Sequence, residues 1–176
     1  MRFFACLSFC VCIFASALQA EPEKAIKDLG PLSPDLFLKM PFDELADVES
    51  LSLLKLSGQQ KIQTLALVQR LPKLVTLRFD YCDLTSFDAK DTVPAKVTSV
   101  IIADGKISQG TIRWLAKFPE GTSLLFGCNV RGLDFNLGKF SWLTFDGCEI
   151  SRSAVTKLVE KMTQVTFKEV TLVDEK

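Results

Sequence analysis

An 11-residue pattern of apolar side chains recurs along this chain, and it constrains the fold more than any other feature. Apolar residues stand at positions 1, 4 and 6, a small residue or a cysteine at position 9, and another apolar residue at position 11. Two copies match at every position: Leu74, Leu77, Phe79, Cys82 and Leu84, then Phe140, Leu143, Phe145, Cys148 and Ile150. Less complete copies begin at Val48, Val97, Glu120 and Met162, so six copies follow one another at steps of 20 to 26 residues.

Each copy has the alternation of a short β-strand. Side chains at positions 4 and 6 point to one side, while those at positions 3, 5 and 7 point to the other. One strand cannot bury its own apolar face, so the copies must stack on each other. We therefore expect a parallel sheet with strands about 4.8 Å apart, one buried face and one open face.

The segments between the strands are expected to return over the buried face. Helical periodicity predicts one helix within residues 59–71 that buries Ile62, Leu65, Val68 and Leu71. Two more helices are predicted after Ser108 and after Ser151 or Ser153, which are good N-caps. Residues 85–96 and 131–139 contain proline or glycines and predict irregular returns.

With this spacing the pattern resembles the leucine-rich repeat family, in which Leu-x-x-Leu-x-Leu-x-x-Asn/Cys-x-Leu recurs every 20 to 29 residues. Cysteine at position 9 is similar to the cysteine-containing variants of that family. The resemblance covers residues 48–172. It implies an α/β solenoid of about six repeats, with a parallel sheet on the concave side and short helices or irregular returns on the convex side. It also implies a non-catalytic module that binds a protein or peptide on the concave sheet.

Residues 1–20 have the layout of a secretory signal peptide. Arg2 precedes an uncharged run from Phe3 to Leu18, and small residues lead to Ala20. Because this run is short for a membrane span, cleavage near Ala20 is favoured over an uncleaved anchor or a buried helix. We expect a secreted or periplasmic protein with no stable membrane span after cleavage.

Two further segments follow the signal peptide. Residues 21–47 are interpreted as an N-terminal cap, with a helix that starts at Ser33-Pro34-Asp35 and carries Leu36, Phe37 and Met40. Residues 48–176 form the repeat domain. Few residues follow Leu172, so we expect the last repeat to be open or paired, and a homodimer through this uncapped repeat is one alternative.

The fourth copy admits two registers that exchange the buried and open faces of its strand. Aligning Cys128 with Cys148 buries Leu125, Cys128 and Val130 and places Leu124 and Phe126 on the open face. The other register buries Leu124 and Phe126 and places Asn129 at position 9. We favour the first register, because Gly127-Cys128-Asn129-Val130 parallels Gly147-Cys148-Glu149-Ile150.

In the favoured register the open face carries an apolar patch with polar neighbours, which is typical of an interaction site. The candidate binding residues are Arg78, Asp80, Tyr81, Ile101, Leu124, Phe126, Trp142 and Asp146. Two alternatives stay open: the register is wrong, or the cap or a second copy covers the patch. The alternative function is a cell-wall or glycan-binding module, in which Tyr81, Phe126 and Trp142 stack on sugar rings.

Several function classes are disfavoured by what the chain contains. There is no histidine, which excludes Ser-His-Asp and Cys-His catalysis and histidine metal ligation. The 21 basic residues equal the 21 acidic residues, so no basic field attracts nucleic acid. Asp80 and Asp146 lie three repeats apart, about 14 Å, which is too far for a cooperating carboxylate pair. We expect no enzyme activity, no catalytic residue, no metal and no cofactor.

The cysteines of the repeats have two interpretations. Cys82, Cys128 and Cys148 are expected to be small buried side chains. Alternatively, Cys128 and Cys148 form a disulfide, because consecutive repeats place their Cα atoms about 5 Å apart. Parallel side chains in one column resist the near-90° torsion of a disulfide, so free thiols are favoured.

Overall fold

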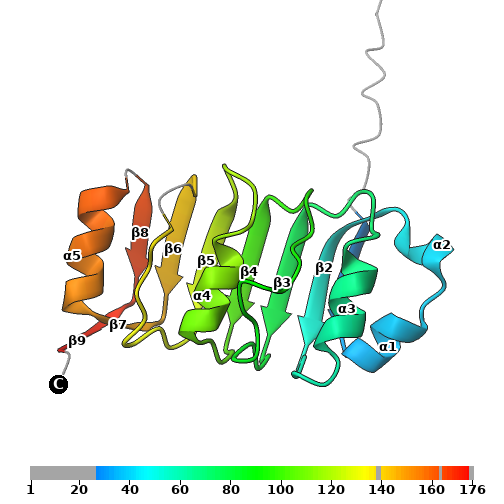
Figure 1. Cartoon of the computed structure of the whole chain (residues 1–176), viewed down its shortest axis with the longest axis horizontal. Coiled ribbons are helices and arrows are strands. Elements are labelled where there is room, and N and C mark those ends of the chain that lie inside the picture. Colours follow the sequence, from blue (N-terminus) through cyan, green and yellow to red (C-terminus); the bar gives the residue numbers. More distant parts are fainter. Residues whose placement is uncertain (1–26, 138–139, 163, 175–176) are drawn as a thin grey trace, which may run out of the picture.

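The computed structural model describes residues 27–137, 140–162 and 164–174. Its main feature is one parallel sheet of seven strands that pair in chain order. These strands are β1 (Lys27–Leu32), β2 (Val48–Leu54), β3 (Thr76–Asp80), β4 (Ser99–Ala103), β5 (Ser123–Gly127), β6 (Trp142–Asp146) and β8 (Val165–Lys168). Two short strands, β7 (Glu149–Ser151) and β9 (Thr171–Val173), pair separately. Figure 1 shows the seven strands side by side along the long axis of the molecule.

The helices are short. They are α1 (Pro34–Lys39), α2 (Phe42–Leu45), α3 (Lys61–Val68), α4 (Gln109–Leu115) and α5 (Arg152–Lys161). α3, α4 and α5 lie on one face of the sheet, and α1 and α2 lie at its β1 end (Figure 1). The side chains of Ser108 and Ser151 cap α4 and α5 as predicted, and residues 85–96 and 131–137 contain no helix. The predicted α/β class with a parallel sheet is confirmed.

Positions 4 and 6 of the pattern form the buried face of the sheet. Position 4 pairs across neighbouring strands through Leu51, Leu77, Val100, Leu124, Leu143 and Val165, and position 6 through Leu53, Phe79, Ile102, Phe126, Phe145 and Phe167. From β2 to β6 these side chains are at most 2% exposed, whereas the two on β8 are only partly buried. The pattern therefore predicts the register of every copy except the fourth.

Position 8 turns the chain after five of the strands. Its residues have positive φ angles: Lys55 (59°), Tyr81 (54°), Asp104 (51°), Gly147 (64°) and Glu169 (49°). This left-handed region is unfavourable for residues that carry a Cβ atom, so a recurring positive φ at four such residues is a fixed feature of the fold. The turn directs the next side chain, at position 9, back toward the core.

The fourth copy is one residue shorter than the others at this turn. Leu124 pairs with Val100 and Phe126 with Ile102, and the two side chains are 2% and 0% exposed. The prediction that Leu124 and Phe126 lie on the open face is therefore wrong. Cys128 and Val130 are nevertheless buried, as the favoured register required. Both observations hold because this copy lacks the left-handed residue, so that its cysteine follows the position-6 side chain by two residues instead of three.

Helix α3 is rotated relative to its prediction. Leu65 and Val68 are buried, but Ile62 is 74% exposed and Lys61 is buried instead. The Lys61 ammonium donates to the backbone oxygen of Ser86 (2.8 Å) and to Asp91 Oδ2 (2.9 Å). These partners come from the following irregular return, and they compensate for the removal of the lysine from water.

The segment before β2 covers the first strand of the repeat array. Ser33 and Pro34 begin α1 as predicted, and Phe37 and Leu45 are fully buried. Strand β1 has no counterpart in the prediction, because its mostly exposed residues lack apolar alternation. The predicted signal peptide, residues 1–20, lies outside the described residues.

Candidate functional site

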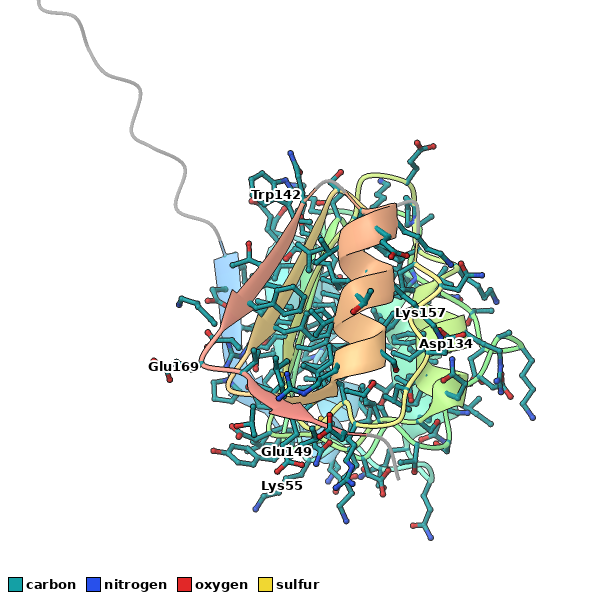
Figure 2. All side chains as sticks on the ribbon, turned by 90° about the vertical axis from the view of Figure 1, so that its left-hand side faces the viewer. Lys55, Asp134, Trp142, Glu149, Lys157 and Glu169 are labelled. Carbon is teal, nitrogen blue, oxygen red and sulfur yellow. The ribbon has the colours of Figure 1, made fainter. Side chains whose placement is uncertain are left out.

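One face of the sheet is left uncovered by the described helices, and we call it the open face. It consists of the side chains at positions 3, 5 and 7 of the strands. Figure 2 looks along the row of strands and shows that the helices lie on the side of the sheet opposite to the open face. Because helices and returns bury the other face, this is the sheet surface on which a ligand can reach several strands together.

Most of the predicted site residues lie on the open face. Arg78 and Asp80 belong to β3, Ile101 to β4, and Trp142 and Asp146 to β6, and all five occupy positions 3, 5 or 7. Tyr81 follows β3 at position 8 and is exposed. Leu124 and Phe126 are core residues, and the residue that β5 presents on the open face is Leu125, which is half-buried. In the sequence, only the alternative register of the fourth copy, which buries Leu124 and Phe126, places Leu125 on the open face.

A hollow of about 390 Å³ lies in the middle of the open face, and we call it the central hollow. Its lining consists of Arg78, Ile101, Ala103, Asp104, Leu125, Gly127, Asp146 and Gly147. The hollow exists because position 7 carries only Ala103 on β4 and Gly127 on β5, between larger side chains on β3 and β6. Ile101 and Leu125 contribute apolar surface, while Arg78, Asp104 and Asp146 contribute charge. This mixture of an apolar floor and a few charged groups is common in binding sites.

A second hollow, of about 410 Å³, lies closer to β1, and we call it the edge hollow. It is lined by Asp28, Gly30, Pro31, Ser50, Ser52, Leu54, Arg78, Asp80 and Tyr81. The hollow is deep over β2 because positions 3 and 5 of this strand carry the small side chains of Ser50 and Ser52. Arg78 belongs to both hollows, so this side chain divides the open face into two neighbouring subsites.

Arg78 is held in place by hydrogen bonds. Its Nε donates to both carboxylate oxygens of Asp80, each at 2.8 Å, and Ser52 Oγ donates to Asp80 Oδ2 at 2.6 Å. Burial alone raises the pKa of Asp80, but the hydrogen bonds from Arg78 and Ser52 outweigh this effect and leave the pKa below its ordinary value. Asp80 is therefore ionised at neutral pH, and its main role in this arrangement is to position the guanidinium.

The two exposed aromatic side chains of the predicted site do not lie together. Trp142 begins β6, whereas Tyr81 follows the end of β3. Three strand spacings of about 4.8 Å separate these strands, so the rings lie more than about 14 Å apart. With Phe126 in the core, the three predicted aromatic residues do not form one stacking platform.

The three thiols of the described residues are free and buried. Cys148 Sγ donates to the backbone oxygen of Phe126 at 2.8 Å. Burial raises the pKa of Cys82 to about 11 and that of Cys128 to about 12. Thiols with raised pKa values are poor nucleophiles and poor metal ligands at neutral pH, so their described environment is that of packing residues.

Comparisons with known proteins return no relative. A scan against models of protein families finds no match, and searches of curated proteins and of solved structures find none either. Within the described part of the chain, no group of three or more cysteine, aspartate or glutamate side chains is arranged to hold a metal ion. None of the helices described in the structure is long and apolar enough to cross a membrane.

Proposed function

We propose that this chain is an exported, non-catalytic binding module that recognises an extended segment of a protein or peptide on its open face. The observation that carries the proposal is the central hollow, where an apolar floor from two strands meets charged groups from three positions. Protein interfaces commonly combine an apolar centre with a polar rim. A segment that lies across the strands can occupy both hollows and contact Arg78, which lines both of them.

We further propose that the chain is a leucine-rich-repeat-like solenoid. Support comes from six strands that carry the repeated pattern, pair in chain order and keep positions 4 and 6 on one face. Such stacks expose broad surfaces for partner binding. Export is proposed from residues 1–20 alone, and intact-mass measurement of the exported protein tests it, since the expected chain begins at Glu21.

Glycan binding is the weaker alternative on this surface. It required Tyr81, Phe126 and Trp142 to present their rings together, because sugar recognition relies on stacked aromatic side chains. Phe126 is fully buried and the other two rings are far apart, so we do not propose this function.

A peptide selection tests the proposed function while the natural partner is unidentified. Peptides that bind the purified protein are selected from a random displayed library. Their affinities are then measured for the wild type and for the Ile101→Arg and Leu125→Arg variants. We expect their affinity to fall by roughly tenfold or more, since large charged side chains fill the central hollow.

The control for this experiment is Leu36→Arg, which changes an exposed apolar side chain of α1 at the β1 end of the molecule. Thermal unfolding is measured for all variants, so that loss of binding is separated from loss of fold. Equal affinity for wild type and both open-face variants would contradict the proposal. Retention of the protein on polysaccharide, abolished by Trp142→Ala, would instead favour the glycan alternative.

A further inference from the structure

The described residues at the β8 end of the sheet form an apolar surface. Figure 2 looks onto this end, where α5, β8 and β9 face the viewer. We call this surface the β8 end. Its apolar side chains are Val155, Val159, Met162, Val165, Phe167 and Leu172. Val159 is 60% exposed and Leu172 is 41% exposed, while the other four are partly buried. Exposed apolar patches on soluble proteins commonly mark interaction sites.

A column of stacked rings stops at this end. Phe126 and Phe145 stack with their centroids 5.4 Å apart, and Phe145 and Phe167 stack at 5.5 Å. The first two rings are fully buried, whereas Phe167 lacks an aromatic neighbour on its outer side within the described chain. The buried core therefore continues up to the surface instead of ending beneath polar side chains.

Among the described residues, no strand pairs with the outer edge of β8. Leu143 N–H donates to the backbone oxygen of Gln164 (3.1 Å), and Gly147 N–H donates to that of Lys168 (3.0 Å). Backbone groups of successive residues in a strand point to opposite sides, so the N–H and C=O groups of Val165 and Phe167 point away from β6. An unpaired row of this kind is a template for another strand.

The opposite edge of the sheet, at β1, is poorly suited to strand addition, which disfavours an open chain of copies joined head to tail. Strand β1 pairs with β2 irregularly, with register shifts after Lys27 and after Leu29, and it contains Gly30 and Pro31. Irregular pairing and proline prevent a new strand from joining an edge. Strand β8, by contrast, pairs regularly with β6 and contains no proline, so its outer edge can accept a strand. The irregular β1 edge therefore disfavours head-to-tail joining of β8 to β1, but it does not disfavour joining of β8 to β8.

We propose that a second copy of this chain covers the β8 end, with the two β8 strands antiparallel about a two-fold axis at Thr166. This arrangement places Val165 of one copy opposite Phe167 of the other, and the free N–H and C=O groups of these residues pair across the interface. The two α5 helices then meet through Val159. Two charged side chains beside the β8 end are paired within one copy, Arg152 with Asp174 (2.9 Å) and Lys168 with Asp146 (3.6 Å), which limits repulsion between the copies.

The test is the molar mass of the purified chain, measured by sedimentation equilibrium over a wide concentration range. We expect twice the mass of one chain for the wild type and one chain mass for Val159→Lys. The matched control is Ile62→Lys, which changes another strongly exposed apolar helix residue, on α3, and is expected to remain dimeric. Because both side chains point into solvent in one copy, both variants should fold, which circular dichroism verifies.

Three outcomes would overturn this inference. The first is a single-chain mass for the wild type at every concentration. The second is a mass that grows without limit, which indicates head-to-tail joining. The third is dissociation of Ile62→Lys to the same degree as Val159→Lys. Hydrogen exchange adds a local measurement, since the amides of Val165 and Phe167 should be protected in the wild type and unprotected in Val159→Lys.

Discussion

Thr64 and Thr111 are both fully buried threonines in helices, but only one of them has its hydroxyl satisfied. Thr111 Oγ1 donates to the backbone oxygen of Leu84 (2.7 Å) and accepts from the Ser108 N–H (3.0 Å). Thr64 Oγ1 has no hydrogen-bond partner in the described structure. Burial of an unpaired hydroxyl is unfavourable, whereas a paired one contributes to stability.

We therefore predict opposite effects of the same substitution at these two positions. Thr64→Val should raise the free energy of unfolding by about 1 kcal/mol, because it removes the unpaired hydroxyl at nearly constant volume. Thr111→Val should lower it by about 1 to 3 kcal/mol, because it leaves the Ser108 N–H without this partner and removes one of the two hydrogen bonds that the Leu84 oxygen accepts. Urea unfolding of the two variants and the wild type measures both changes. Equal destabilisation of Thr64→Val and Thr111→Val would contradict the unpaired state of the Thr64 hydroxyl.

The lowered pKa of Asp80, which lies on the open face, predicts that the stability of the fold depends on pH. Its pKa is below the ordinary value in the folded chain, so the unfolded chain binds protons more readily. The resulting stabilisation is complete above the unfolded pKa of about 4 and is lost as the pH falls through the folded pKa. In urea unfolding, the stability advantage of the wild type over Asp80→Asn should shrink on acidification. A constant difference between pH values of about 6 and 2.5 would contradict this role.

Single residues also account for what the sequence could not predict. The fourth copy differs from the others by one missing residue at its turn, and a fixed 11-residue template cannot reveal such a deletion. The burial of Cys128 and Val130 agrees with one register, while that of Leu124 and Phe126 agrees with the other. The strand of this copy follows one register and its turn follows the other.

Helix α4 packs so closely on the preceding irregular return that one of its residues has no room for a side chain. A Cβ atom at Gly110 would lie 2.4 Å from the backbone oxygen of Phe87. The same return receives a hydrogen bond from Trp114 Nε1 to the Thr92 oxygen at 2.9 Å. The glycine therefore permits the approach that buries Trp114 among Phe79, Phe87 and Phe118.

Gly110→Ala should destabilise the protein, although alanine favours helices by about 1 kcal/mol over glycine. Overpacking of a core commonly costs about 1 to 3 kcal/mol, and here the obstacle is backbone that cannot move aside cheaply. Thermal unfolding should show a lower Tm than the wild type. The control is Gly30→Ala on β1, where no atom lies within 4 Å of the added Cβ and little change is expected. A Tm for Gly110→Ala at or above that of the wild type would contradict the close approach.

At the level of elements, apolar periodicity predicts the strands better than the helix faces. The strands alternate between a buried and an open side, and their neighbours are other copies of the same pattern. The buried face of α3 instead depends on an irregular return that supplies Ser86 and Asp91 as partners for Lys61. Periodicity alone assigns such a lysine to solvent and its neighbour Ile62 to the core, which is the reverse of what the structure shows.

For the molecule as a whole, stacked copies produce two surfaces with different origins. The central hollow arises from small side chains at one strand position, so it depends on the register of β4 to β6. The β8 end arises because β8 is the last strand of the described sheet, so within the described residues no further repeat covers its apolar layer. The sequence predicts an open face and an open or paired last repeat. It also predicts Arg78, Ile101 and Asp146 as residues of the open face, whereas the place of Leu125 in the central hollow follows only from the structure.

Protection of an introduced thiol at Leu125 tests peptide binding at the central hollow most directly. The chain's own thiols in the described residues are buried, and the pKa values of Cys82 and Cys128 are raised, so they react slowly with a maleimide. Leu125→Cys should react readily in the free protein and slow down as a selected peptide saturates it, while Leu36→Cys on α1 keeps its rate. Rapid labelling of Leu125→Cys that the bound peptide leaves unchanged would contradict the assignment of the binding site.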